Sequence, residues 1–161
     1  MKVLLTGSSK GIGYKIAKDL LAEGHELALH YNKNESPLED LLKDDKTGSF
    51  SIKADLSEQE EIKKMVENTI DKLSFPDCII NNAGIAESAD ISLDIDNWSN
   101  MFDKTIDVNL KAPSIIFKEF LKYKRERNIN SRLRIINIAS RAAFRGEQQD
   151  YISYACSKGG I

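Results

Sequence analysis

The sequence predicts an α/β fold, a doubly wound parallel sheet with helices on both faces. Two observations predict it. Apolar runs of strand length alternate with longer stretches of helical period along the whole chain, a pattern that produces right-handed crossovers in a parallel sheet. A glycine-rich segment also follows the first apolar run directly and opens the first helical stretch, as in a strand–turn–helix unit.

Five strands are predicted. Each is a short apolar run, and the third alternates apolar and polar residues; they cover 2–5, 26–31, 50–54, a segment that starts at Cys78, and 132–140. The apolar centre of the fifth segment is typical of a parallel strand that is covered on both faces.

The helices are expected between these strands. The first begins near Ile12 and stops at Gly24, and Ser57 with Glu60 predicts a capping box for the helix after the third strand. Residues 97–124 read as one long helix capped by Asp96. Pro113 lies inside it and lacks the N–H that would bond the carbonyl of Asn109, so we expect a kink there and a free carbonyl.

Composition and charge exclude several classes of function. The 161 residues suit one domain, and a net charge of -2 gives no overall attraction to nucleic acid or to an anionic membrane. The cysteines Cys78 and Cys156 are far apart, which suggests free thiols in a reducing cytoplasm. Asp90, Asp94 and Asp96 resemble a calcium loop only weakly, so no metal site is predicted.

The segment "TGSSKGIG", residues 6–13 and hereafter the glycine turn, is the first candidate site. Glycines let the backbone approach a pyrophosphate, and the N-terminus of the following helix supplies N–H groups to it. The alternative is a tight turn without a ligand. The spacing of Gly7, Gly11 and Gly13 is T-G-x-x-x-G-x-G, which differs from the patterns G-x-G-x-x-G and G-x-x-x-x-G-K-[ST].

This spacing resembles the short-chain dehydrogenase/reductase family, and other family motifs follow in order. They are Asp55 after the third strand, "NNAG" at 81–84, Asn109 in "DVNLKAP", Ser140 at the end of the fifth strand, and the Y-x-x-x-K pair of Tyr154 and Lys158. The resemblance covers residues 1–161 and is closest to the 3-oxoacyl-[acyl-carrier-protein] reductase-like members and to the general carbonyl or sugar-alcohol dehydrogenases of the family. It implies a single NAD(P)-binding Rossmann domain with five strands in the order 3-2-1-4-5 and the C-terminal strands missing.

The resemblance also implies a set of contacts with the dinucleotide. They are Gly7, Ser9, Lys10, Gly11, Ile12, Gly13, Asn32, Lys33, Asp55, Leu56, Asn82, Ala83, Gly84, Tyr154 and Lys158. Tyr31 occupies the position where NAD-preferring members carry an acid, while Lys10 and Lys33 suit a 2′-phosphate. We therefore expect NADP (NADPH) rather than NAD as the cofactor. The alternative is that Lys10 and Lys33 are solvated surface lysines that contact no ligand.

The implied catalytic residues are Asn109, Ser140, Tyr154 and Lys158. Hydride addition to a carbonyl leaves an alkoxide that needs a proton, and a tyrosine is a fitting acid. Lys158, one helical turn along, would favour the phenolate and, in the family, binds the nicotinamide ribose. Ser140 would hydrogen-bond the substrate oxygen, and the Asn109 carbonyl holds a water in the family's proton relay. Taken singly, each residue also has a structural explanation.

The function expected is hydride transfer between NADP(H) and a small carbonyl or alcohol substrate, with Tyr154 as acid/base. The alternative is a catalytically incompetent nucleotide-binding module or fragment. An acyl carrier protein is a further candidate partner, and a homodimer or homotetramer is expected at full length. The chain ends three residues after Lys158, where family members continue, so we expect a truncated or incompletely represented reductase.

Overall fold

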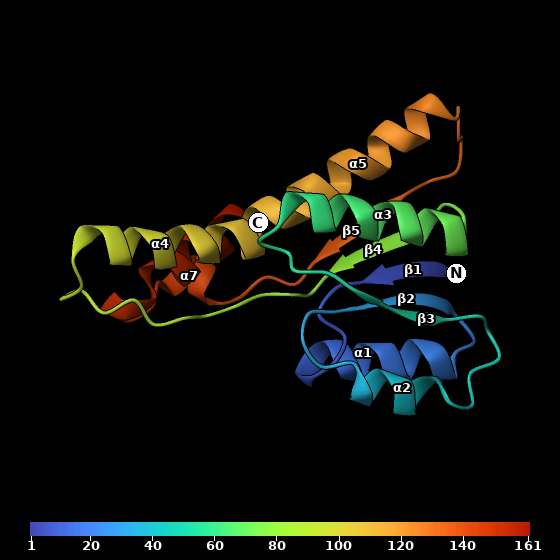
Figure 1. The fold of residues 1–161 in the computed structure, drawn as a ribbon, viewed down its shortest axis with the longest axis horizontal. Helices are drawn as coiled ribbons and strands as arrows, with labels where there is room; N and C mark the ends of the chain where they lie inside the picture. The colour runs from blue at the N-terminus through green and yellow to red at the C-terminus, as the bar shows by residue number, and fades with distance from the viewer.

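The computed structural model describes all residues from 1 to 161 and contains one parallel sheet with helices on both faces (Figure 1). Its elements are β1 (Lys2–Leu5), α1 (Gly11–Ala22), β2 (Glu26–Tyr31), α2 (Ser36–Leu42), β3 (Phe50–Lys53), α3 (Gln59–Leu73), β4 (Cys78–Asn81), α4 (Ile95–Ile106), the π-helical segment η1 (Asp107–Lys111), α5 (Ala112–Glu126), β5 (Arg134–Asn137), α6 (Ala142–Arg145), the 3₁₀ segment η2 (Gln149–Tyr151) and α7 (Ile152–Gly160).

The strand order is β3-β2-β1-β4-β5 and every pairing is parallel, which confirms the predicted fold class and order. Val3 of β1 lies opposite Leu27 of β2 and Cys78 of β4, so the central strands are in register across the sheet. Parallel strands all end at the same edge. The residues that follow β1, β2, β3 and β4 are therefore brought together at that edge.

Side chains alternate between the two faces of the sheet and build two apolar clusters. Leu4, Ala28 and Ile79 pack with α3 and α5 on one face, whereas Leu5, Leu29 and Ile80 pack with α1 and α2 on the other. Figure 1 shows these helix pairs on opposite sides of the sheet. Because both faces of the central strands are covered, β1, β2 and β4 are almost entirely buried.

The fifth strand differs from its prediction. It spans only Arg134–Asn137, and Ile136 is 47% exposed, so the expectation of cover on both faces is wrong for residues 1–161. The strand lies at the end of the sheet, next to β4 alone, and neither Ile135 nor Ile136 takes part in the two apolar clusters that the helices build on the sheet.

Two predicted helix caps are also wrong. Ser57 does not cap α3, because both its N–H and its hydroxyl donate to the Asp55 carboxylate, and the helix starts after Glu58 without a side-chain cap. This local turn competes with the capping box. Asp94 caps α4 in place of Asp96, since its carboxylate accepts the Asn97 N–H at 3.0 Å.

The long helix predicted at 97–124 is present but is not uniform. It runs from Ile95 to Glu126 and passes through the π-helical segment η1, where the Ala112 N–H bonds the Asp107 carbonyl five residues earlier. Pro113 lies just after η1, so the helix is irregular at the predicted place, in the form of a π segment, while the free carbonyl of Asn109 stays a prediction.

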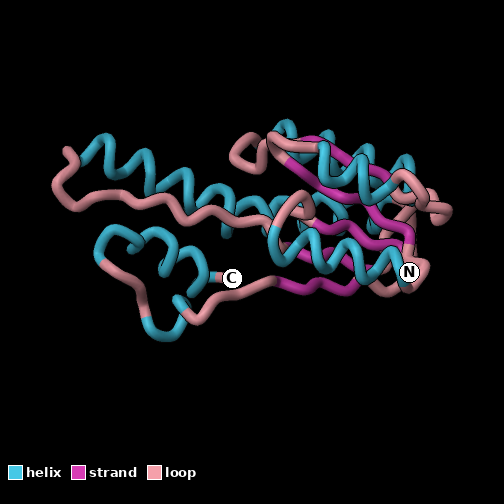
Figure 2. The backbone as a smooth tube through the Cα atoms, turned by 90° about the horizontal axis from the view of Figure 1, so that it is seen from below, coloured by secondary structure: helices cyan, strands magenta, loops and turns pink.

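Helices α4, α6 and α7 extend past the edge where the strands end, whereas α5 packs on the sheet. Figures 1 and 2 show α4 and α7 beyond the sheet and next to each other, with α6 packed against α7. None of the helices combines the length and apolar character needed to cross a membrane.

Candidate active site

The glycine turn connects β1 to α1 and packs tightly against the end of β4. Gly7 has a φ of +65°, and a Cβ at this position would lie 2.8 Å from the Ala83 Cα. A Cβ at Gly13 would lie 2.2 Å from the Gly7 carbonyl oxygen. The Asn82 amide donates to the carbonyls of Thr6 (3.0 Å) and Gly7 (2.9 Å). These contacts leave room only for glycine at Gly7 and Gly13.

The N-terminus of α1 is free to receive an anion. The helix begins at Gly11, and Lys10 before it provides no side-chain cap. The first backbone N–H groups of a helix have no intrahelical partner, and they carry the positive end of the helix dipole. Ile12, in the first turn, is 65% exposed and lines the cavity described next.

A cavity of about 660 Å³ lies at the ends of the strands next to this helix terminus. Every predicted dinucleotide contact except Tyr154 and Lys158 lines it: Gly7, Ser9, Lys10, Gly11, Ile12, Gly13, Asn32, Lys33, Asp55, Leu56, Asn82, Ala83 and Gly84. Residues that the motifs did not indicate also line it, namely His30, Asn34, Ile85, Glu87, Lys104 and Val108. The cavity is of the size that ligand sites have in proteins.

A bound dinucleotide would place a ribose near the end of β2, and no acidic residue from this part of the chain lines the cavity. Tyr31 packs in the apolar cluster beneath α1 and α2, and its hydroxyl donates to the Glu35 carboxylate at 2.7 Å. This bond raises the pKa of Tyr31 to about 12. Ser51 also donates to Glu35, and hydrogen bonds from Ser51 and Tyr31 lower the pKa of that carboxyl. Glu35 is thus held outside the cavity that Asn32 and Lys33 line.

Asp55 and Lys104 are charged residues that line the cavity, and the charge of Lys104 acts on the Asp55 carboxylate. Hydrogen bonds from Ser57 hold the pKa of Asp55 below its ordinary value, so this carboxylate is ionised at neutral pH. Lys104 of α4 forms an ion pair with Glu87 at 2.8 Å. Both partners of this pair are partly exposed, so it contributes little to stability.

Asn109 and Lys158 meet beside Gly84. A Cβ at Gly84 would lie 3.3 Å from Asn109 Oδ1 and 3.6 Å from Lys158 Nζ. The Asn109 side chain is buried in η1; it accepts the Ile85 N–H (2.8 Å) and donates to the Ile85 carbonyl (2.8 Å) and to Ser157 Oγ (3.0 Å). These bonds attach the kinked helix both to the segment after β4 and to α7.

Lys158 is held by one backbone carbonyl. Its ammonium donates to the Ile138 carbonyl at 2.8 Å, and burial lowers the pKa of Lys158. Tyr154 lies one turn earlier in α7 and is partly exposed. Ser157 ties this turn together by donating to the Tyr154 carbonyl at 2.8 Å.

Ser140 lies between β5 and α6, and its hydroxyl accepts the Ala142 N–H at 3.2 Å. No hydrogen bond joins Ser140 to Tyr154. The structure thus brings Asn109 and Lys158 together beside the glycine-lined cavity, and it places Tyr154 and Ser140 on neighbouring elements, since α6 packs against α7.

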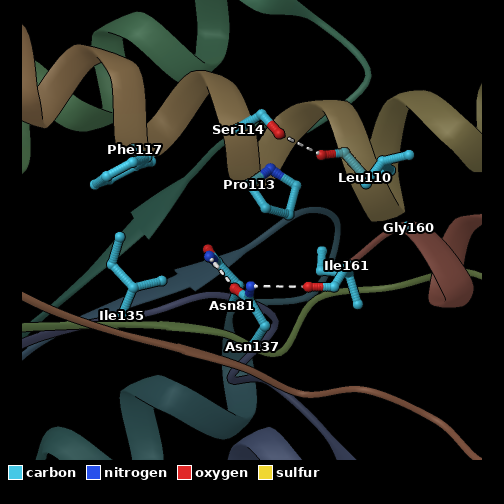
Figure 3. Close-up of a pocket in the computed structure, with 9 residues that line it drawn as sticks. All are labelled: Asn81, Leu110, Pro113, Ser114, Phe117, Ile135, Asn137, Gly160 and Ile161. Carbon is cyan, nitrogen blue, oxygen red and sulfur yellow. Dashed lines mark hydrogen bonds between the residues drawn. The ribbon is translucent and has the colours of Figure 1, made fainter.

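A second cavity, of about 230 Å³, lies under α5 and is separate from this site (Figure 3). Asn81 donates to Asn137 at 2.8 Å, and Asn137 donates to the Ile161 carbonyl at 3.4 Å. None of the predicted site residues lines this second cavity. Its lining residues are Asn81, Leu110, Pro113, Ser114, Phe117, Ile135, Asn137, Gly160 and Ile161.

In residues 1–161, no group of three or more histidine, cysteine, aspartate or glutamate side chains is arranged so that it could hold a metal ion.

A doubly wound sheet with a glycine turn, an uncapped helix N-terminus and a cavity at the strand ends defines a dinucleotide-binding α/β domain. The model of the short chain dehydrogenase family matches residues 1–161, and the chain belongs to this family of nicotinamide-dependent oxidoreductases. Within the family it is similar to the 3-oxoacyl-[acyl-carrier-protein] reductases.

Three similarities support this assignment. The chain is 32% identical over 112 residues to the 3-oxoacyl-[acyl-carrier-protein] reductase FabG of Staphylococcus epidermidis, which covers 68% of this chain and 45% of that protein. It is 33% identical to the apo SCOR enzyme from Clostridium thermocellum (TM-score 0.82, covering 99% of this chain and 61% of that one). Actinorhodin polyketide ketoreductase F189W with NADPH is 27% identical (TM-score 0.79, covering 99% and 60%). The matched parts therefore span from 45% to 61% of the length of these proteins.

Proposed function

We propose that this chain carries the cofactor site and the catalytic residues of an NADPH-dependent carbonyl reductase. The observation that carries the proposal is the adjacency of two groups of residues. The cavity beside the uncapped α1 terminus is lined by the glycine turn, and the buried pair of Asn109 and Lys158 lies next to it at Gly84. Lys158 also lies one turn after Tyr154 in α7, so the cavity adjoins the helix that carries the candidate acid/base.

The residues present fit a dinucleotide. The α1 N-terminus would receive the pyrophosphate, the exposed Ile12 would be covered by the ligand, and Asp55 with Leu56 would line the adenine end. When bound, the reduced nicotinamide would supply a hydride to the substrate carbon, and in the reverse direction the oxidised nicotinamide would accept one from it. Tyr154 would deliver the proton to the substrate oxygen, and Ser140 would donate a hydrogen bond to the same oxygen.

Lys158 would support Tyr154 in two ways. As a cation one turn away in the same helix, it favours the phenolate when the proton has left. Its Nζ has one backbone partner, the Ile138 carbonyl, so two of its three protons remain for a ribose hydroxyl or a water. Asn109 would keep η1, the segment at Ile85 and α7 in one arrangement through its three side-chain bonds.

NADPH oxidation in the presence of a reactive diketone tests the proposal. We expect the protein to bind NADPH and to oxidise it when the diketone is present. Turnover is followed as the loss of nicotinamide absorbance. Saturable binding without turnover would favour the alternative, a nucleotide-binding module or fragment without catalysis. The absence of both binding and turnover would contradict the assignment of the cavity itself.

The preference for NADP(H) rests on Lys10 and Lys33, which line the cavity, and on Glu35, which is bound elsewhere. We expect Lys10→Ala to weaken NADPH binding by roughly tenfold and NADH binding by much less, because only NADPH carries the 2′-phosphate. Dissociation constants for both nucleotides measure this, with Lys18→Ala on the exposed side of α1 as the matched control. Equal losses for NADPH and NADH would contradict the role of Lys10.

The wider setting follows from the family. The relative named above acts, by its name, on acyl-carrier-protein substrates, and we propose a small carbonyl or alcohol, or a 3-oxoacyl group on an acyl carrier protein, as substrate. We also propose that residues 1–161 form a single domain, that the protein acts in the cytoplasm, and that the full-length protein is a homodimer or homotetramer.

A further inference from the structure

His30 is a buried histidine whose two ring nitrogens are both hydrogen-bonded. It lies on β2, is 2% exposed and lines the 660 Å³ cavity. Its Nδ1 accepts the Gly7 N–H at 3.0 Å, and its Nε2 lies 3.0 Å from the Ala54 carbonyl oxygen. A carbonyl can only accept, so Nε2 carries the proton. The ring is therefore neutral and in a single tautomer.

The backbone of the same residue also supports the glycine turn. The His30 carbonyl accepts two bonds from Ser8, one from its N–H at 2.9 Å and one from its hydroxyl at 2.8 Å. One residue of β2 thus bonds both Gly7 and Ser8 in the turn that follows β1. Through Nε2 it also bonds Ala54, which immediately precedes Asp55 and Leu56 at the end of β3.

We propose that His30 is a positioning residue of the cofactor site, whose imidazole fixes the glycine turn relative to the Asp55–Leu56 segment. The proposal rests on the proposed function, namely that this cavity binds the dinucleotide. The pyrophosphate side of the cavity comes from the turn and the adenosine side from the segment after β3. The imidazole spans the two, so it sets their separation before the cofactor arrives, and this preorganisation strengthens binding.

The electrostatic surroundings keep the ring neutral. Burial lowers the pKa of His30, while the bond to Ala54 and the charge of Asp55 act in the opposite direction. Asp55, from the segment after β3, is the charged group that acts on the ring; Lys10 of the glycine turn and Lys33 after β2 line the same cavity. Protonation would place a second N–H at Nδ1, facing the Gly7 N–H, and two donors cannot bond each other.

Three substitutions separate the two bonds. His30→Asn places an amide oxygen near the position of Nδ1 and retains the bond to Gly7, whereas His30→Gln reaches the position of Nε2 and retains the bond to Ala54. His30→Leu loses both. We expect the NADPH dissociation constant to rise roughly tenfold or more in His30→Leu and about threefold in each amide variant. Ile70→Val, in the α3 core, is the control that lowers stability without touching the cavity.

A pH series on the cofactor-free protein gives an independent readout. The pKa of His30 is lower in the folded chain than in the unfolded one, so below about pH 6.5 the unfolded chain binds more protons. We expect the folding equilibrium constant of the wild type to fall by up to about tenfold per pH unit below that point. His30→Asn and His30→Leu should lose this dependence.

The outcomes separate this inference from the proposed function. If the wild type binds NADPH, and folded His30→Asn, His30→Gln and His30→Leu bind it with the wild-type dissociation constant, the positioning role is wrong and the cofactor site stands. If Ile70→Val weakens binding as much as the His30 variants do, the loss is one of general stability and the inference falls. If the wild type does not bind NADPH, the proposed function is wrong and the inference fails with it, whatever the pH series gives.

Discussion

Gly13→Ala is expected to abolish nucleotide binding. A methyl group at this position would lie 2.2 Å from the Gly7 carbonyl oxygen and 2.4 Å from Asn82 Nδ2, both far inside van der Waals contact. Neither neighbour can move freely, because the Asn82 amide holds the Thr6 and Gly7 carbonyls and the Gly7 N–H is bonded to His30. The turn must therefore shift away from β4, and the α1 terminus shifts with it.

We expect the NADPH dissociation constant of Gly13→Ala to rise at least about a hundredfold, with a loss of about 1–3 kcal/mol in the free energy of unfolding from overpacking. Gly24→Ala is the matched control, because Gly24 has a φ of +78° but no neighbouring atom within 4 Å and lies outside the cavity. It should lose stability and retain binding. A folded Gly13→Ala protein with the wild-type dissociation constant would contradict the close packing described for the glycine turn.

Tyr154→Phe carries the second large effect. The substitution removes one hydroxyl oxygen and keeps the ring in α7. If Tyr154 is the acid/base, turnover of NADPH with a diketone should fall by about 10²–10⁴, while the NADPH dissociation constant should change by no more than about threefold. A loss in binding as large as the loss in turnover would indicate a cofactor contact without a catalytic role.

Tyr151→Phe is the control for this experiment. Tyr151 ends η2 three residues earlier and has a similar partial exposure, yet no catalytic role is proposed for it. We expect Tyr151→Phe to retain the wild-type rate. Equal rates for Tyr154→Phe and the wild type would contradict the acid/base assignment, and the Asn109–Lys158 pair would then need another explanation.

The sheet was predictable because its strands are short apolar runs that obey simple rules. A run such as that of β2, buried on both faces, can be recognised without knowledge of its neighbours, and parallel order follows from the alternation with helices. The residues at which the helices begin, and their caps, were harder to predict. Ser57 donates to Asp55 and does not cap α3, and Asp94 rather than Asp96 caps α4, because short polar side chains near a helix start have several local hydrogen-bond partners to choose from.

The candidate site divides in the same way. The glycine spacing predicted the part of the cavity that the glycine turn lines, because steric demands at Gly7 and Gly13 constrain the sequence, and the family resemblance implied the other predicted lining residues. The role of His30 was not predicted, since its partners Gly7 and Ala54 are distant in the chain and only the register of the strands brings them together. A histidine inside the apolar run "ELALHY" was the available signal. The meeting of Asn109 and Lys158 at Gly84 likewise depends on how η1 and α7 pack.

The most direct test of the central claim, that the cavity at the strand ends binds the dinucleotide, is a titration of the wild-type chain with NADPH followed by nicotinamide fluorescence. We predict saturable binding with one site per chain that excess 2′,5′-ADP displaces, because the adenosine half occupies the cavity lined by Lys10, Lys33 and Asp55. Absence of binding, or binding that 2′,5′-ADP does not displace, would contradict this assignment of the cavity.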